Sequence, residues 1–291
     1  MGPADADAIL AWYAARRRDL PWRRTRDPYR ILVSEVMLQQ TQVARVVPYY
    51  EAFLARFPTA AALAAAPAAD VLARWSGLGY NRRALMLHAA ARAVARDGWP
   101  GDAAGLRALP GVGPYTAAAV ASFAFGEQVA AVDTNVRRVI ERVDGRVRPP
   151  RALAARAAEL LPPGRAADWN QALMELGATV CGARAPDCAA CPVAGCASRG
   201  RVAAGAPPAN GAAGRRGGRS GRRARRRRFE ETDRYVRGRV LAALVAGARA
   251  EELVAGRALP EGVAPARVAR AIAGLERDGL VVREGATVRL P

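Results

Sequence analysis

The sequence predicts a mainly α-helical chain that ends in a small α+β module. Through residue 200, apolar residues recur at helical spacing, and no alternating strand pattern appears. Four cysteines are confined to residues 181–196, which indicates a compact metal-binding loop rather than a disulfide framework. Two short strand-like runs occur only after residue 278. We therefore expect a helical region followed by a separate small domain.

Glycine and proline residues divide this pattern into short helices. Leu20-Pro-Trp22 ends the first of them, and residues 76–80 form a glycine-bracketed turn. In the first 200 residues, helices are expected at 5–18, 31–44, 46–57, 59–65, 68–75, 81–96, 136–143, 151–161 and 169–180, besides one that starts at Pro114. Near the end of the chain, helices at 236–246 and 268–278 and strands at 279–283 and 286–290 suggest a winged helix, a module that binds DNA or only packs.

The charge indicates a polyanionic partner. The 291 residues carry a formal net charge of +19, and every basic residue is arginine. Without lysine, no side-chain amine can form a Schiff base. Residues 203–228 are rich in Gly, Ala and then Arg, so we expect a disordered linker that attracts phosphates or is simply solvated.

Membrane and secretory signals are not expected. The sequence contains no apolar run of about 18 residues. Residues 1–8 are acidic and lack the basic start of a signal peptide. A cytosolic location is therefore the default. His88 is the only histidine and is expected to serve packing or the surface rather than catalysis.

A glycine turn opens one of the central helices. Gly111, Val112 and Gly113 precede a helix that begins at Pro114, and Asp133 follows that helix. Free N–H groups at such a helix start can bind a phosphate. The residues alone leave two interpretations open: a hairpin that holds a DNA backbone near a carboxylate, or an ordinary helical hairpin.

Glu35 is an acid among the apolar residues of its helix. From the pattern alone, an exposed glutamate at the helix edge is the more frequent explanation. The cysteines, with gaps of six, two and four residues, can bind zinc or a [4Fe–4S] cluster, and the spacing favours iron–sulfur only modestly. Such a loop could also present Arg184 and Arg199 to phosphates.

Together, these segments resemble the adenine DNA glycosylases of the MutY type, within the helix-hairpin-helix superfamily that contains endonuclease III. The resemblance covers about residues 9–196. Its most specific carrier is the run Ser34-Glu-Val-Met-Leu-Gln-Gln-Thr-Gln42. The other carriers are Leu20-Pro-Trp22, Gly77-Leu-Gly-Tyr80, Leu109-Pro-Gly-Val-Gly113, Val132-Asp133, Asn135-Val136 and the cysteines.

The resemblance implies roles for individual residues. It reverses the interpretation of Glu35, which would be the acid that protonates adenine at N7, with a pKa raised by apolar neighbours. Asp133 would stabilise the sugar cation, as in glycoside cleavage. The resemblance also implies that Asn135 and Tyr115 support the carboxylates, and that the adenine pocket is formed by Arg18, Leu20, Trp22 and Gln171. Thr41 and Leu78 would contact the opposite base, and Gln40 and Tyr80 would insert into the duplex. Gly111, Val112 and Gly113 would bind a phosphate, and the [4Fe–4S] ligands would be Cys181, Cys188, Cys191 and Cys196.

The resemblance also implies a domain plan and a partner. Residues 1–200 would form the glycosylase domain, with a six-helix lobe at about 23–127 and an iron–sulfur lobe from 1–22 and 128–200. A linker at 201–228 and a winged-helix-like domain at 229–291 would follow. The expected partner is duplex DNA with A:8-oxoguanine or A:G pairs, bound by a monomer in the cytoplasm at the nucleoid.

The sequence departs from the family pattern in three places. The last cysteine gap is four residues instead of five, and Asn81 replaces a frequent second tyrosine. The C-terminal segment does not look like the Nudix-like domain that often reads 8-oxoguanine, so this would be a short form.

Three other functions remain as alternatives. An endonuclease III-like lyase needs a lysine where Tyr115 stands. A thymine or uracil mismatch glycosylase is compatible with Tyr115, but the run around Glu35 favours adenine. A non-enzymatic iron–sulfur DNA-binding regulator would leave Glu35 and Asp133 unexplained.

Overall fold

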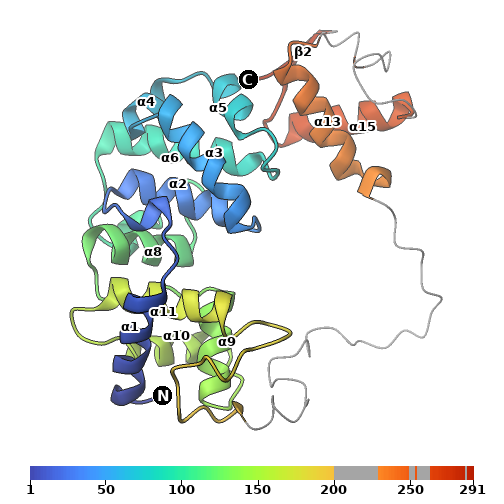
Figure 1. Cartoon of the computed structure of the whole chain (residues 1–291). Helices are drawn as coiled ribbons and strands as arrows, with labels where there is room; N and C mark the ends of the chain where they lie inside the picture. Colours follow the sequence, from blue (N-terminus) through green and yellow to red (C-terminus); the bar gives the residue numbers. More distant parts are fainter. Residues whose placement is uncertain (200–228, 249–252, 254–262, 286) are drawn as a thin grey trace, which may run out of the picture. The chain divides into compact units, whose positions relative to one another are not determined.

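A computed structural model describes residues 1–199, 229–248, 253, 263–285 and 287–291 (Figure 1). The α-helices are α1 (Pro3–Arg16), α2 (Pro28–Leu38), α3 (Val43–Arg56), α4 (Ala60–Ala65), α5 (Ala68–Trp75), α6 (Arg82–Asp97), α7 (Ala103–Leu106), α8 (Pro114–Phe125), α9 (Thr134–Val143), α10 (Pro150–Glu159), α11 (Ala166–Thr179), α13 (Asp233–Val245) and α15 (Pro265–Arg277). Short 3-10 turns are η1 (Pro21–Arg23) and η2 (Phe229–Glu231), and the strands are β1 (Val282–Glu284) and β2 (Thr287–Arg289).

The contacts divide the chain into two units. One unit contains Met1–Leu32, Trp99–Ala108 and the segment that starts at Val112. The other contains Val33–Gly98, Leu109–Gly111 and the C-terminal segment. Up to residue 199 the described chain contains helices and turns only, as the sequence predicts.

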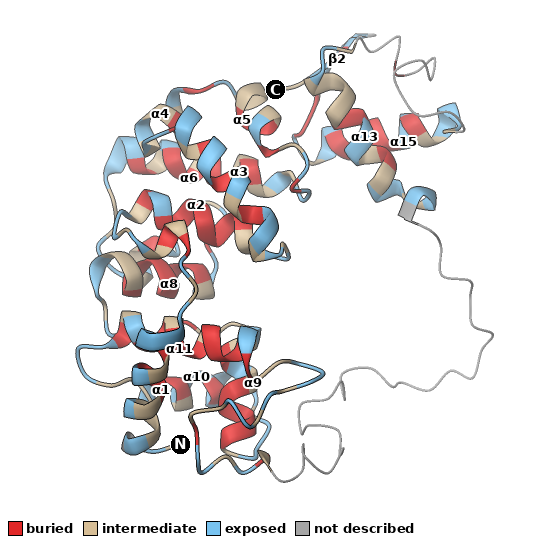
Figure 2. Cartoon of the chain, in the orientation of Figure 1, coloured by how far each residue is buried: buried red, intermediate tan, exposed pale blue. Residues whose placement is uncertain are grey.

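The first unit has a core where α1, α9, α10 and α11 meet. Ile9, Ile140, Trp169 and Leu173 are at most 1% exposed, and they belong to one apolar cluster. Figure 2 shows buried segments of α9, α10 and α11 in red. Helix α8 packs against α11 through small residues, since 117–121 are all buried and four of the five are alanines. Alanine lets the two helix backbones approach closely, which places the start of α8 beside α11.

The second unit has an aromatic core. Phe53 of α3 meets Phe57 and Trp75 edge to face, with ring centroids 5.0 and 6.0 Å apart. Helix α4 packs along α6, where His88 is buried. Burial lowers the pKa of His88, so its imidazole is neutral at pH 7, which agrees with a packing role.

The C-terminal segment follows the predicted order of helices and a hairpin. Helices α13 and α15 pack together, and β1 pairs antiparallel with β2 in the register Val282 to Arg289. Val236, Ile272 and Val288 are buried in this segment. The strands are three residues long, shorter than expected. The expected linker at 203–228 lies outside the described residues.

One expected helix, residues 31–44, was wrong in its extent. Helix α2 ends at Leu38, and a turn over residues 39–42 separates it from α3. The cause is local, because Gln40 adopts a left-handed conformation with φ of 57°, which no α-helix tolerates. The chain also forms α7, a single turn that the sequence pattern did not predict, where Asp102 caps the helix by accepting from the Gly105 N–H.

Within the part of the chain that the structure describes, no helix is both long enough and apolar enough to cross a bilayer.

Candidate active site and cysteine loop

The glycine turn before α8 has the conformation that the sequence suggests. Gly111 has φ of 75°, and a Cβ at this position would lie 2.5 Å from Cβ of Met86. Only glycine fits there, both for its φ and for its lack of a side chain. Gly113 is the N-cap of α8, Pro114 takes the first helical position, and Val112 is buried beneath the turn. Gly113 and Pro114 are exposed, so the positive end of the helix is open to an anion.

Asp133 is the N-cap of α9 and is held in one orientation. Its Oδ1 accepts from the backbone N–H groups of Asn135 at 2.9 Å and Val136 at 2.7 Å. Its Oδ2 accepts from Nδ2 of Asn135 at 2.8 Å. These three donors fix the carboxylate at the N-terminal end of α9. Asn135 therefore contacts both oxygens of the Asp133 carboxylate.

Asn135 is in turn fixed by Arg138, a residue that the sequence analysis missed. The Arg138 guanidinium donates to Oδ1 of Asn135 at 2.6 Å and to the carbonyls of Gly177 and Cys181 at 2.5 and 2.7 Å. A Cβ at Gly177 would lie 2.6 Å from Cβ of Asn135, so α11 packs directly against the start of α9. No sequence signal distinguished Arg138 from the many other arginines. It connects the carboxylate to the cysteine loop.

Tyr115 lies in the first turn of α8 and is half-buried. Its hydroxyl contacts the sulfur of Met174 on α11 at 3.7 Å, and its ring packs against the alanine cluster of α8. Tyr115 and Asp133 belong to the same unit, and α11 contacts the helices that carry both.

Glu35 is buried on α2, with 6% of its surface exposed. The exposed helix-edge position that the residue pattern favoured is therefore wrong, and the position expected from the family resemblance is right in this respect. Ile31, Leu32 and Val36 of the same helix are equally buried. A carboxyl in such surroundings is a candidate for acid–base chemistry, because burial disfavours its charged form.

The predicted base-pocket residues Arg18 and Gln171 are both held by hydrogen bonds that involve side chains of α11. Arg18 makes a bidentate pair with Glu175 through Nε and Nη2, each at 2.7 Å, and Arg23 adds a third contact at 2.7 Å. Gln171, one turn earlier, accepts from the Tyr13 hydroxyl at 2.6 Å. Leu20 and Trp22 of the intervening segment are buried. Glu175 was missed, although an acid four residues after Gln171 in an apolar helix was a usable signal.

The Glu175 carboxylate should make stability depend on pH. Burial by itself would raise its pKa, but the hydrogen bonds from Arg18 and Arg23 outweigh burial and lower the pKa from 4.5 to about 2. Because the folded pKa is depressed, the stabilisation is complete above the unfolded pKa and is lost as pH falls from about 5 toward 2. A shift of this size corresponds to at most about 3 kcal/mol.

We expect that Glu175→Gln lowers the unfolding free energy at pH 7. The difference in unfolding free energy between the parent and this variant should shrink as pH approaches about 2, and urea unfolding at several pH values measures it. A difference that stays constant across this range would contradict the assignment of the low pKa to Glu175.

The predicted DNA-insertion residues Gln40 and Tyr80 share an unusual backbone. Among the described residues they are the only non-glycine residues with positive φ, at 57° and 51°. Such strain costs about 1–3 kcal/mol per residue and is concentrated at functional sites. Both side chains are exposed, Tyr80 by 43%. Thr41 is half-buried beside Gln40, while Leu78 is buried between Gly77 and Gly79.

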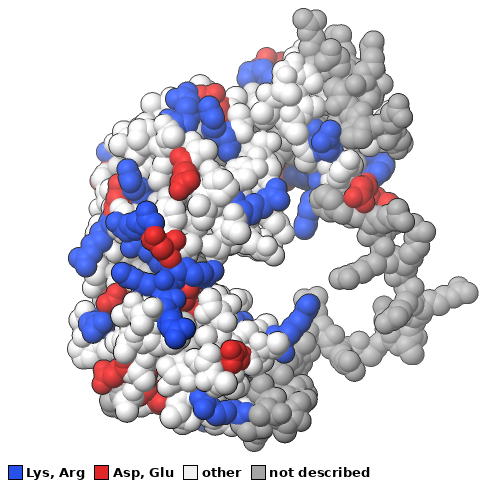
Figure 3. Space-filling view, viewed as in Figure 1, with Lys and Arg blue, Asp and Glu red and all other residues white. Residues whose placement is uncertain are grey.

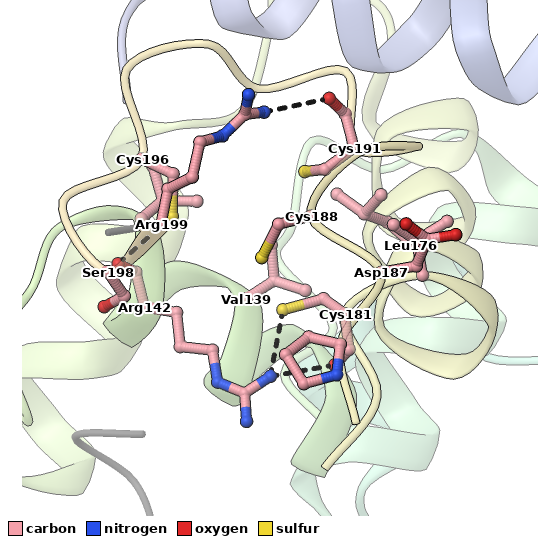
Figure 4. A pocket seen from close by; sticks show the side chains of 13 residues that line it. Val139, Arg142, Leu176, Cys181, Asp187, Cys188, Cys191, Cys196, Ser198 and Arg199 are labelled. Carbon is pink, nitrogen blue, oxygen red and sulfur yellow. Dashed lines mark hydrogen bonds between the residues drawn. The ribbon is translucent and has the colours of Figure 1, made fainter. Parts of the chain in front are cut away.

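The four cysteines line one pocket (Figure 4). The sulfurs of Cys181, Cys188, Cys191 and Cys196 face into it. All four are free thiols. Among the described residues, no three His, Cys, Asp or Glu side chains are grouped as ligands of a single metal ion.

Two arginines support the cysteine loop from within. Arg142 is 2% exposed, and its Nη1 lies 3.3 Å from the Cys181 sulfur and 2.8 Å from the Gly182 carbonyl. Arg199 donates to the carbonyls of Cys191 and Val193 at 3.2 and 2.8 Å. The Arg199 guanidinium is thus engaged with carbonyls of the loop, while Arg184 is exposed. The molecular face drawn in Figure 3 carries more arginine than acidic side chains.

The fold and the site together define a protein of the helix-hairpin-helix base excision repair class. The model of the HhH-GPD superfamily base excision DNA repair proteins matches residues 33–163. A solved thermostable thymine-DNA glycosylase is 34% identical, with a TM-score of 0.63 over 67% of this chain and 95% of that one. A trapped endonuclease III–DNA complex has a TM-score of 0.60 at 23% identity, over 68% of this chain and 95% of that one, and shows the same fold.

Curated relatives narrow the class. The adenine DNA glycosylase of Mycolicibacterium smegmatis is 47% identical over 81% of this chain and 78% of its own length. That of Mycobacterium tuberculosis is 46% identical over 94% of this chain and 89% of its own length. The human adenine DNA glycosylase is 44% identical over 67% of this chain and 39% of its own length. The chain belongs to the adenine DNA glycosylase family, and it is a DNA glycosylase of base excision repair.

Proposed function

We propose that this glycosylase removes adenine paired with 8-oxoguanine or guanine in duplex DNA, after the adenine has been turned out of the base stack. The observation that carries the proposal is Glu35, a carboxyl buried in a helix within the run of residues 34–42 that resembles adenine glycosylases most specifically. Extrusion is needed because an enzyme cannot reach the glycosidic bond inside a stacked duplex.

The two carboxyl groups divide the chemistry. Glu35 donates its proton to N7 of adenine, so the base leaves with the electron pair of the N-glycosidic bond. Asp133, held in place by the donors at the start of α9, stabilises the positive charge that develops on the sugar. Water then adds to the sugar carbon and loses a proton, which leaves an abasic site. Asn135 and Tyr115 support Asp133 and the reacting sugar.

The other assigned residues bind the substrate. Arg18, Leu20, Trp22 and Gln171 hold the extruded adenine. Glu175 of α11 fixes Arg18, and Tyr13 of α1 fixes Gln171. Gln40 and Tyr80 fill the space that the adenine leaves, and Thr41 and Leu78 contact the opposite base. Gly111, Val112 and Gly113 bind a phosphate through backbone N–H groups at the start of α8.

The strand stays intact in this proposal. A lyase forms a Schiff base with the sugar, and this chain contains no lysine for that step. Tyr115 stands at the hairpin position where a lyase would need lysine.

The rate of base release under single-turnover conditions tests the proposed preference for adenine. Duplexes pair A, T, U or C with either G or 8-oxoguanine, and each is also treated with borohydride to trap an imine. We expect release of adenine opposite both partners and no trapped adduct. Faster release of thymine would favour the runner-up, a mismatch glycosylase, which the solved thymine-DNA glycosylase relative makes the main competitor. A trapped adduct would contradict the monofunctional assignment.

The four cysteines are proposed to hold a [4Fe–4S] cluster. The sulfurs of all four cysteines face one pocket, and four thiolates are the ligand set of a [4Fe–4S] cluster. When bound, the cluster would cross-link the loop and offset the thiolate charge. Arg142 and Arg138 hold the Cys181 segment against α9 and thereby against Asp133.

We expect purified protein to contain iron and sulfide in equal amounts, about four of each per chain. Removal of the iron should melt the loop and lower the thermal midpoint, because the binding free energy of such a site contributes to folding. The matched comparison is Cys188→Ser, which should lose iron, beside Ser198→Ala, which should keep it. Stoichiometric zinc with little iron would contradict the cluster.

The remaining assignments concern domains and location. We propose a glycosylase domain over 1–200 with lobes at about 23–127 and at 1–22 with 128–200, a linker at 201–228 and a winged-helix-like domain at 229–291. Two helices followed by an antiparallel hairpin support the last of these. A monomeric protein in the cytoplasm, associated with the nucleoid, fits a DNA substrate.

A further inference from the structure

Two turns of the second unit carry the residues proposed to enter the duplex. The first turn, residues 39–42, follows α2 and presents Gln40. The second turn, residues 76–80, follows α5 and presents Tyr80. Both residues have left-handed φ values, so neither turn is in its intrinsically preferred conformation. Something outside each turn must hold it in place.

Arg83 of α6 makes contacts to both turns. Its Nη1 donates to the carbonyls of Val36 at 2.9 Å and Met37 at 3.4 Å, at the end of α2, and also to the carbonyl of Gln39 in the first turn. Its Nη2 donates to the Thr41 hydroxyl at 3.4 Å and to the Gly79 carbonyl of the second turn at 3.3 Å. A single guanidinium therefore connects the two turns.

The same guanidinium also lies against aromatic rings. Its central carbon is 5.2 Å from the centroid of the Tyr80 ring and 5.7 Å from that of the Trp75 ring. Trp75 closes the second turn by donating to the Gly79 carbonyl at 3.1 Å. A flat, delocalised cation can stack on a ring while its edge donates to several carbonyls, and lysine cannot reproduce this pattern.

Arg83 is costly to keep in this position. Burial lowers its pKa, and its Nε is buried without a hydrogen-bond partner. No carboxylate is paired with it among the ion pairs of the described residues. A half-buried cation that contacts only carbonyls, a hydroxyl and rings is unusual for a stabilising residue. The contacts instead fix geometry.

We propose that Arg83 is a positioning residue that holds the turns of Gln40 and Tyr80 at a fixed spacing, so that both side chains are ready to enter the duplex together. The inference rests on the proposed role of those two residues in base extrusion. Arg83 itself does not touch the reacting atoms. Its loss would affect the extrusion step more than bond cleavage.

The test compares two duplexes under single-turnover conditions with saturating protein. One pairs adenine with guanine, and the other places adenine opposite an abasic-site analogue, where extrusion requires less unstacking. We expect Arg83→Met to slow release from the A:G duplex by about 10–100-fold and to slow release from the second duplex far less. Arg83→Lys should behave more like Arg83→Met than like the parent, because an ammonium cannot contact both turns.

Controls separate the possible failures. Arg96→Met removes an exposed charge from the far end of α6 and should match the parent on both duplexes. Equal slowing of Arg83→Met on the two duplexes, or full recovery with Arg83→Lys, would overturn the role of Arg83. Gln40→Ala and Tyr80→Ala test the extrusion role of those two residues separately. If these variants slow release equally on the two duplexes, the extrusion role fails. If they slow release mainly on the A:G duplex but Arg83→Met does not, only the inference about Arg83 is rejected.

Discussion

Glu35→Gln should nearly abolish adenine release while duplex binding survives. The amide has the shape of the protonated acid but cannot supply a proton to the leaving base. General acid catalysis contributes about 10²–10⁴-fold to a rate, so single-turnover release should slow by that factor. The measurement is the release rate from an A:G duplex at saturating protein, with affinity determined separately by gel shift or anisotropy.

Glu51→Gln is the matched control for this variant. Glu51 is an exposed glutamate on α3 of the same unit, so its amide should leave both release and binding unchanged. Release by Glu35→Gln at more than about one tenth of the parental rate would exclude Glu35 as the acid. Loss of binding together with release would point instead to a folding defect.

Asp133→Asn should also stop base release, for a different reason. Asparagine is as good an N-cap as aspartate, so helix α9 should persist. The negative charge beside the sugar is lost, and the new amide meets Nδ2 of Asn135, which is itself a donor. Removal of one such electrostatic contact typically costs about 10²–10³-fold in rate. Asp133→Asn should therefore lower the release rate strongly but lower the thermal midpoint of unfolding only slightly.

Asp102→Asn controls for the capping role. Asp102 caps α7 by accepting from the Gly105 N–H at 2.7 Å, so the same substitution changes a cap without touching the site. We expect parental release rates from this variant. If Asp133→Asn releases adenine as fast as Asp102→Asn does, the proposed stabilisation of the sugar cation is wrong.

The sequence predicted most of the helices because their apolar spacing and their glycine and proline boundaries are local properties. It failed at residues 39–42, where no proline or glycine interrupts the helical pattern. The left-handed conformation of Gln40 there is sustained by tertiary contacts, among them the Gln39 carbonyl with Arg83. Contacts of this kind are invisible to periodicity.

The site followed the same division. Asp133 was singled out by its place after the glycine hairpin and by the family resemblance, while its position as the N-cap of α9 was not predicted. Glu35 was misjudged by periodicity and recovered only through the resemblance of its surrounding run. Arg138, Glu175 and Arg83 were missed because their roles depend on partners about 40 to 157 residues away in the chain.

The central claim is that Glu35 acts by placing a proton on N7 of adenine. Replacing that nitrogen with a C–H group, as in 7-deazaadenine, removes the acceptor and leaves the rest of the base unchanged. Single-turnover release from matched duplexes with adenine or 7-deazaadenine opposite guanine compares the parent with Glu35→Gln. We expect the parent to release 7-deazaadenine no faster than Glu35→Gln releases adenine. Release of 7-deazaadenine by the parent at the rate of adenine would contradict the mechanism.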